Sequence, residues 1–331
     1  MPRLSILDQS VRFASRDAAS IFQGTLEAAR LCDRLGYGRF WVSEHHASSF
    51  ICGSSPEVLI SAIGAATTRI RIGSGGIMLP HYSAYKVAEN FAVLSNLYPG
   101  RVDLGVGRAP GADMRVAAVL AAPHPPDFRR FPQQVVQLRG HLTGEIREPR
   151  LSPEPAGEVP LWILGTSPDS AILAGQLGLP YAIALFINPM AERGLADIYR
   201  HHFTPSPQCS APHLMIAVTA LAADAPDQAR RLQKNYHVNI ARMLLGNRDG
   251  QALSPDETMD YEFDAREAML VGSQAQVSAF GVAAEVRDRL EQIARTFGAD
   301  EIMVSTNCYD RADRMRSLEL MAECFELAEA A

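Results

Sequence analysis

Lysine is nearly absent from this 331-residue chain. Lys86 and Lys234 are the only two, so 29 of the 31 Lys and Arg residues are arginines. The arginines form no basic cluster, and the formal net charge at pH 7 is −6. A mildly acidic chain without a basic stripe argues against nucleic acid and anionic membranes as partners. The 47% hydrophobic and 21% charged content excludes a wholly disordered chain.

Cysteine pairs and long apolar runs are also missing. The five cysteines are scattered and form no CxxC pair, which excludes a disulfide framework and a zinc ribbon. The N-terminal segment lacks the apolar core of a signal peptide. No apolar run approaches the roughly 20 residues that a membrane span needs. We therefore expect a reduced, soluble, cytoplasmic protein that binds neither nucleic acid nor membrane.

Short apolar runs alternate with helical patterns along the chain. Several runs are almost continuously apolar, as in strands covered on both faces. This order predicts an α/β fold of the (β/α)8 TIM-barrel type, with a doubly wound sheet as the alternative because a pattern does not show closure. The predicted strands are Leu4–Asp8, Arg39–Glu44, Ile70–Gly75, Val102–Gly107, Leu161–Gly165, Tyr181–Leu185, Leu214–Leu221 and Glu301–Thr306.

Two connections are longer than a compact domain usually needs. Pro110–Pro160 follows the fourth strand and surrounds a helix predicted near Phe131–Leu142, while Gly246–Gly272 lies between the seventh and eighth strands. Another helix is predicted over Gln276–Phe297. Long insertions are often lids or binding loops. With no interdomain linker in the sequence, we expect one domain over residues 1–331.

Polar and glycine-rich residues follow several strands, where a barrel places its catalytic groups. His45 follows the second strand and could act as an acid or base near neutral pH; a hydrogen-bonded core histidine is the alternative. Gly75 and Gly76 let the backbone approach a flat ligand closely, or form a β-bulge. His45 and His46 as a metal site would favour a barrel hydrolase, but the sequence has no HExxH or HxH spacing.

A possible phosphate site follows the fifth strand. Ser167 has the position of an N-cap and Pro168 that of the first helical residue, so free N–H groups there could bind a phosphate. Ser170 could add a hydroxyl, and Arg108 after the fourth strand a positive charge. A capped helix without ligand and a surface ion pair are the alternatives. Asp169 counts against a phosphate unless its carboxylate points away, as we expect it to.

An ordered set of motifs resembles the bacterial luciferase-like flavin monooxygenases. The resemblance covers nearly the whole chain and implies a (β/α)8 barrel that binds FMN at the carboxyl ends of its strands, usually as a homodimer packed through the second and third helices. The motifs are Phe40–His46 with its Glu-His-His signature, Ile70–Pro80, Tyr98–Arg108, Leu161–Ser167 and Asp300–Val304.

The resemblance also implies a reaction. Reduced FMN comes from a separate flavin reductase, and O2 adds to it to give a C4a-(hydro)peroxyflavin that oxidises a small or mid-sized organic substrate; we expect natural-product tailoring. A non-catalytic flavin-binding protein and a deazaflavin-dependent oxidoreductase of the same fold are the alternatives. Gly107 stands where luciferase has a reactive cysteine, which argues against a long-chain aldehyde luciferase.

Site residues carry over from the same resemblance. His45 matches the catalytic histidine. Gly75 and Gly76 match a non-prolyl cis peptide under the flavin ring, and Gly246–Gly272 matches the mobile active-site loop of luciferase. The residues implied in holding the rest of the cofactor, mainly its phosphate, are Arg108, Gly165, Thr166, Ser167 and Ser170. The loops expected to line the substrate pocket are Ser48–Ser55, Pro110–Arg130, Phe186–Met190 and Gly246–Gly272.

Overall fold

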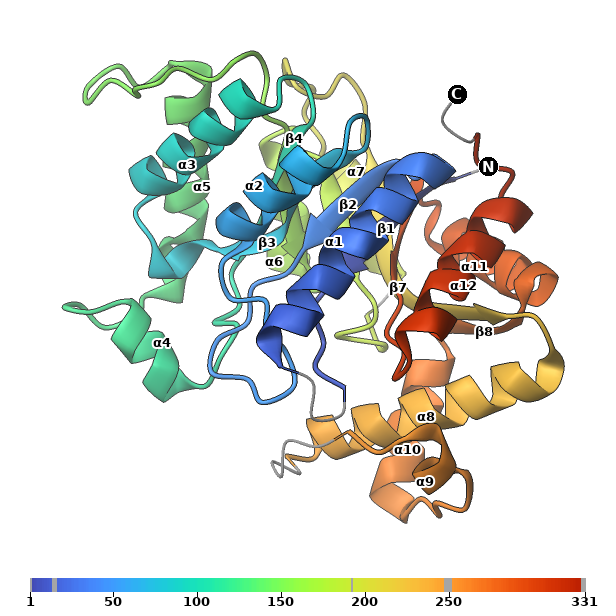
Figure 1. The fold of residues 1–331 in the computed structure, drawn as a ribbon. Helices are drawn as coiled ribbons and strands as arrows, with labels where there is room; N and C mark the ends of the chain where they lie inside the picture. The colour runs from blue at the N-terminus through green and yellow to red at the C-terminus, as the bar shows by residue number, and fades with distance from the viewer. Residues whose placement is uncertain (1, 14–16, 192, 247–251, 329–331) are drawn as a thin grey trace.

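Eight parallel strands close into a barrel in the computed structural model, which describes residues 2–13, 17–191, 193–246 and 252–328. Closure comes from β6 pairing with β7 and from β9 pairing with both β7 and β1. Helices surround the strands (Figure 1), so the predicted (β/α)8 barrel is confirmed. The strands in ring order are β1 (Arg3–Asp8), β2 (Arg39–Val42), β3 (Arg71–Met78), β4 (Val102–Gly107), β5 (Leu161–Gly165), β6 (Tyr181–Ala184), β7 (Leu214–Ala223) and β9 (Glu301–Ser305).

The outer helices pack their apolar faces against these strands. Tertiary contacts join α2 to β3, α6 to β5 and α12 to β7, so each helix is fixed near the strand that it covers. The principal helices are α1 (Ala18–Leu35), α2 (Pro56–Ala66), α3 (Ala84–Leu97), α5 (Phe131–Thr143), α6 (Pro168–Gln176), α7 (Gly194–His201), α8 (Pro226–Leu244), α11 (Ala283–Phe297) and α12 (Arg311–Cys324).

A ninth strand, β8 (Ser278–Val282), corrects one sequence prediction. The expected helix over Gln276–Phe297 is wrong in its first part, and only α11 is helical. β7 is ten residues long, and its last five, Thr219–Ala223, pair with β8 beyond the barrel. Since an apolar run this short fits a strand as well as a buried helix, the free edge of β7 decides the outcome.

Both predicted insertions are present, with more helix than the sequence suggested. α4 (Met114–Leu120) and the 3-10 turn η2 (Phe128–Arg130) precede α5, and a further turn, η1 (Leu79–His81), follows β3. The second insertion holds α9 (Pro255–Met259) and α10 (Ala265–Ala275), both packed on α8. Figure 1 shows α4 projecting from the barrel and α9 and α10 gathered beside α8.

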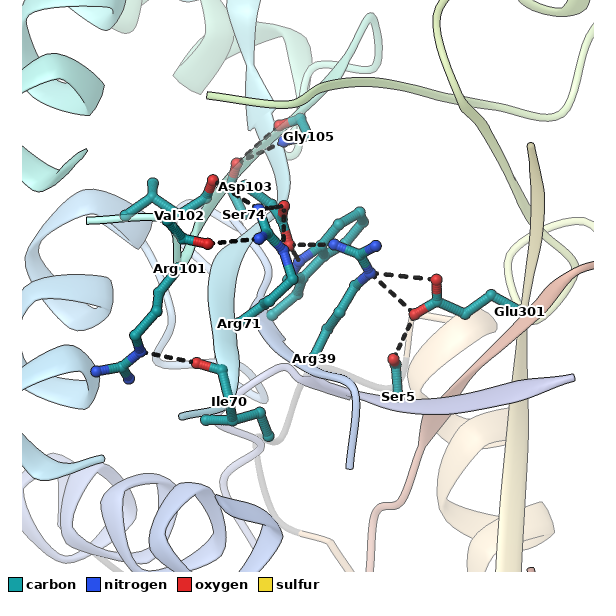
Figure 2. A network of polar contacts seen from close by, with 12 residues as sticks. Ser5, Arg39, Ile70, Arg71, Ser74, Arg101, Val102, Asp103, Gly105 and Glu301 are labelled. Carbon is teal, nitrogen blue, oxygen red and sulfur yellow. Dashed lines mark hydrogen bonds and ion pairs between the residues drawn. The ribbon is translucent and has the colours of Figure 1, made fainter. Parts of the chain in front are cut away.

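The amino-end floor of the barrel is a layer of buried ions (Figure 2). Arg39 extends from β2 between two fully buried carboxylates, with Nη1 2.6 Å from Asp103 Oδ2 and Nε 2.9 Å from Glu301 Oε1. Arg71 adds a second ion pair to Asp103, at 2.6 Å. Burial alone would raise the pKa of Glu301, but the hydrogen bond from His213 and the charge of Arg39 bring it below the usual value. The Glu301 carboxylate can therefore stay ionised inside the protein.

An apolar layer lies above these ions. Trp41 and Trp162 meet edge to face with ring centroids 5.3 Å apart, a preferred aromatic arrangement. The other buried members of the layer are Leu7, Ala182, Met215, Ala217 and Met303. With its amino end filled, the barrel has room for a ligand at its carboxyl end. No helix in the described ranges is long and apolar enough to cross a membrane.

Candidate functional site

A cavity of about 460 Å³ opens at the carboxyl ends of the strands. Its floor includes Trp41 and Met215, and Phe128, Phe131 and Phe186 lie along its walls. The cavity brings together every site residue proposed from the sequence: His45, Gly75, Gly76, Arg108, Gly165, Thr166, Ser167 and Ser170. These residues lie on β3 and β5, on the loops that follow β2, β4 and β5, and, for Ser170, on α6.

His45 lies directly beyond β2 and lines the cavity. Its backbone N–H donates to the Gly53 carbonyl at 2.8 Å, and Nδ1 lies 3.2 Å from Ser43 Oγ. Nε2 has no hydrogen-bond partner in the described part of the chain, so it is the nitrogen available to a ligand. Burial lowers the pKa of His45, although the nearby Glu44 carboxylate partly opposes this shift. The imidazole is therefore neutral at pH 7 and can accept a proton.

Glu44 joins β2 to β3 beneath this histidine. One carboxylate oxygen accepts the Tyr82 hydroxyl at 2.7 Å and lies 2.7 Å from His46 Nε2. The other accepts the backbone N–H of Met78 at 2.9 Å. His46 is thus held by Glu44 and does not line the cavity, so the adjacent histidines have different surroundings. In the described residues no group of three or more His, Cys, Asp or Glu could hold a metal ion.

Gly75 and Gly76 form a bare stretch of cavity wall on β3. The peptide bond between them is cis, as the resemblance implies. A Cβ on Gly76 would lie 2.8 Å from the Gly105 carbonyl oxygen, and one on Gly75 2.8 Å from Leu7 Cδ1. A side chain at Gly76 would meet the backbone of β4, so the packing there requires glycine, whereas one at Gly75 would displace a leucine side chain of the apolar layer.

The start of α6 has the predicted N-cap geometry. Ser167 and Ser170 form a capping box, in which each side chain accepts the other residue's backbone N–H. The Ser170 hydroxyl also lies 2.9 Å from the hydroxyl of Tyr181, whose pKa burial raises to about 12. A Cβ on Gly165 would collide with this Ser170 hydroxyl. The tight cap leaves the backbone N–H of Asp169 without a partner among the described residues, facing the end of the helix where anions bind.

Arg108 and Asp169 meet across the mouth of the cavity. Arg108 Nη1 lies 3.6 Å from Asp169 Oδ2, and the two side chains are 48% and 80% exposed. Asp169 was expected to point to solvent. It is largely exposed, but it also lines the cavity and pairs with the arginine expected to bind phosphate.

The loops expected to line the substrate pocket contribute unequally. Pro110, Gly111 and Phe128 come from the first insertion and Phe186 and Ile187 from the loop after β6. Ser48–Ser55 contributes no lining residue, and neither does the described part of Gly246–Gly272, so the prediction for these two loops is wrong there. α9 and α10 pack on α8 instead. Residues 247–251 lie outside the described residues.

Gln9 is a polar lining residue that the sequence analysis missed. Its side-chain oxygen lies 3.3 Å from Ser305 Oγ and accepts the Asn307 amide at 3.2 Å. Asp8, one residue earlier, instead pairs with Arg314 at 2.6 Å. Because successive residues of a strand face opposite sides, Gln9 faces the cavity while Asp8 faces away from it.

Comparison with known proteins gives a consistent result. A family model described as luciferase-like monooxygenase matches residues 3–301. A luciferase-like monooxygenase of Escherichia coli is 36% identical, covering 97% of this chain and 96% of its own. The N-acetyl-S-alkylcysteine monooxygenase of Bacillus subtilis is 33% identical and is covered over 98% of both chains. The solved structure of apo-MsnO8 is 36% identical, covers 100% of both chains and has a TM-score of 0.90.

More distant solved structures share the fold. The oxygenating constituent of 3,6-diketocamphane monooxygenase from Pseudomonas putida, solved in complex with FMN, is 19% identical with a TM-score of 0.73, and covers 98% of this chain and 97% of its own. An F420-dependent secondary alcohol dehydrogenase is 16% identical with a TM-score of 0.68 and covers 98% of both chains. These two matches show the fold alone.

Proposed function

The chain belongs to the luciferase-like monooxygenase family, and from this premise we propose that it uses reduced FMN and O2 to oxidise a small or mid-sized organic substrate. We propose further that the reduced FMN comes from a separate flavin reductase. The observation that supports this best is a single cavity that joins the start of α6, two wall glycines and a neutral histidine.

The residues present fit a flavin mononucleotide. Arg108, the Ser167 and Ser170 hydroxyls and the free N–H of Asp169 suit a phosphate. Gly165 lets the Ser170 side chain pack against the end of β5, since a Cβ at this position would collide with the Ser170 hydroxyl. Gly75 and Gly76 would face a planar ring, and Thr166 also lines the cavity.

Each group then has a defined task. A reduced flavin supplies the electrons that activate O2. The phosphate cradle binds and orients the cofactor, and the apolar wall that includes Phe128 and Phe131 excludes water from the reacting atoms. His45, neutral at pH 7, accepts or returns a proton at Nε2.

The cofactor could instead be a deazaflavin, which the F420-dependent neighbour of the same fold uses. We favour FMN because the solved oxygenating constituent holds it in this fold, and because the family model is one of monooxygenases. Anaerobic titration with reduced FMN and with reduced F420 compares the two directly. Tighter binding of F420, with hydride transfer and no oxygen consumption, would overturn the proposal.

The substrate presents an apolar group to the cavity, because its walls are largely aliphatic and aromatic. Organic sulfides enter the test panel because the relative from B. subtilis is named for an S-alkylcysteine substrate. Ketones and aldehydes complete the panel. A role in natural-product tailoring stays a prediction.

We also propose that a second copy of the chain covers α2 and α3. Val58 on α2 is 65% exposed, and Val93 and Leu97 on α3 are 44% and 56% exposed. α2 and α3 are in contact, and exposed apolar side chains on two neighbouring helices suit an interface with a second copy. Sedimentation equilibrium measures the mass in solution; a monomer would contradict this proposal.

Oxygen uptake tests the function as a whole. With FMN, NADH and an unrelated flavin reductase present, we expect the protein and one panel substrate to give an oxygenated product. FMN binding without product from any substrate would favour a non-catalytic flavin-binding protein.

A further inference from the structure

Asp169 occupies an unexpected place for a carboxylate. It is the second residue of α6, after the Ser167 cap and Pro168, and it lines the cavity beside the proposed phosphate cradle. Its backbone N–H is available to an anion, while its side chain carries the same sign of charge as that anion. The oxygen Asp169 Oδ2 lies 3.6 Å from Arg108 Nη1, so the carboxylate pairs with the cation that would bind the phosphate.

Without a cofactor, the Asp169 carboxylate therefore offsets the positive charge of Arg108. An incoming phosphate would share or displace the Arg108 contact and would lie close to the carboxylate. We propose that Asp169 is a competing anion, which lowers the affinity of the cradle for a phosphate-bearing flavin and keeps the cofactor exchangeable. This inference rests on the proposed function, because it assumes that the cavity binds a flavin.

A favourable charge at the start of a helix would by itself explain an aspartate at position 169. Pro168-Asp169 begins α6, Pro226-Asp227 begins α8 and Pro255-Asp256 begins α9. An aspartate in the first turn is favourable at any helix start. Asp227 and Asp256 pair with Arg230 and Arg231, and neither aspartate lines the cavity. Asp227 therefore offers a control with the same Pro-Asp helix start and no place in the cavity.

The test compares Asp169→Asn with Asp227→Asn. Dissociation constants for FMN and for riboflavin, which lacks the phosphate, are measured by flavin fluorescence in phosphate-free buffer. We expect Asp169→Asn to tighten FMN binding about three- to tenfold at low salt, as an exposed charge near a phosphate allows. Riboflavin binding should not change, and neither affinity should change in Asp227→Asn.

Salt provides an internal check. Asp169 is largely exposed, so the gain for FMN should shrink as the ionic strength rises above about 0.1 M. An unchanged ratio of FMN to riboflavin affinity in Asp169→Asn would overturn the inference, and so would weaker FMN binding, which would show that Asp169 positions Arg108. Failure of the unaltered protein to bind either flavin, oxidised or reduced, would overturn the proposed function and this inference with it.

Discussion

His45 shows how burial gives a residue its chemistry. The ring is fixed between Ser43 and the cavity, and burial lowers its pKa despite the neighbouring Glu44 carboxylate. A histidine with a lowered pKa keeps its neutral form to a lower pH than a free histidine does. The residue can therefore serve as a base across the neutral range.

Replacing His45 by glutamine should separate catalysis from binding. We expect product formation to fall by about 10²- to 10⁴-fold, the usual contribution of a proton-transfer group, with FMN affinity nearly unchanged. In the unaltered protein the rate should fall as the pH decreases below about 6.5 and through the lowered pKa, because His45 then gains a proton. The pH profile of product formation measures both effects.

The glutamine variant should lack this loss at acid pH. His201→Gln serves as the control, since this histidine is exposed at the end of α7. If the glutamine variant kept both the rate and its decline at acid pH, the role of His45 would be wrong.

The start of α6 combines a helix cap with a proposed phosphate site. Ser167 closes the capping box with Ser170, and Ser254 closes a similar box with Glu257 on α9. Both helices begin Ser-Pro-Asp, but only Ser167 lines the cavity. Substituting each serine in turn therefore separates the effect of a lost helix cap from the effect on ligand binding.

We expect Ser167→Ala and Ser254→Ala each to lower the free energy of unfolding by about 1 kcal/mol, the usual value of an N-cap. Only Ser167→Ala should also weaken FMN binding, with riboflavin binding unchanged. Urea denaturation and flavin titration measure the two quantities. Equal FMN affinity in both variants would exclude Ser167 from the phosphate site.

The sequence predicts some helices and strands well and others poorly. All eight barrel strands were predicted because a strand buried on both faces is a continuous apolar run. β8 was missed because its pairing with the end of β7 is a tertiary contact. α4 and α9 were missed because seven and five residues are too few to show a helical period.

The sequence likewise predicts some residues of the candidate site and misses others. His45, Arg108 and Ser167 come directly after strands, so the barrel rule places them at one mouth. Gln9 and the side chain of Asp169 depend on rotamers and neighbours that no spacing reveals. Which loops line the cavity also depends on packing, as the docking of α9 and α10 on α8 shows.

The whole molecule depends on its ionic floor. Arg39 compensates two fully buried carboxylates, Asp103 and Glu301, and its charge lies 4.9 Å from the centre of the Trp162 ring. A buried ion pair adds little net stability, but removing one partner leaves a costly charge behind. The floor also closes the end of the barrel opposite the cavity.

Arg39→Met should therefore lower the free energy of unfolding by about 3–5 kcal/mol. Arg150→Met is the control, because Arg150 is 77% exposed in its pair with Glu154, and it should cost no more than about 1 kcal/mol. Urea denaturation of both variants provides the comparison. Equal small losses would show that Asp103 and Glu301 are stabilised without Arg39.

The oxygen reaction of bound reduced FMN tests the central claim most directly. Stopped-flow absorbance follows the mixing of O2 with reduced FMN, in the presence and absence of the protein. We expect the protein to delay the appearance of oxidised FMN and to produce a transient absorbance that free FMN does not show, because the cavity would exclude water. Identical traces with and without protein, under conditions where reduced FMN is bound, would contradict it.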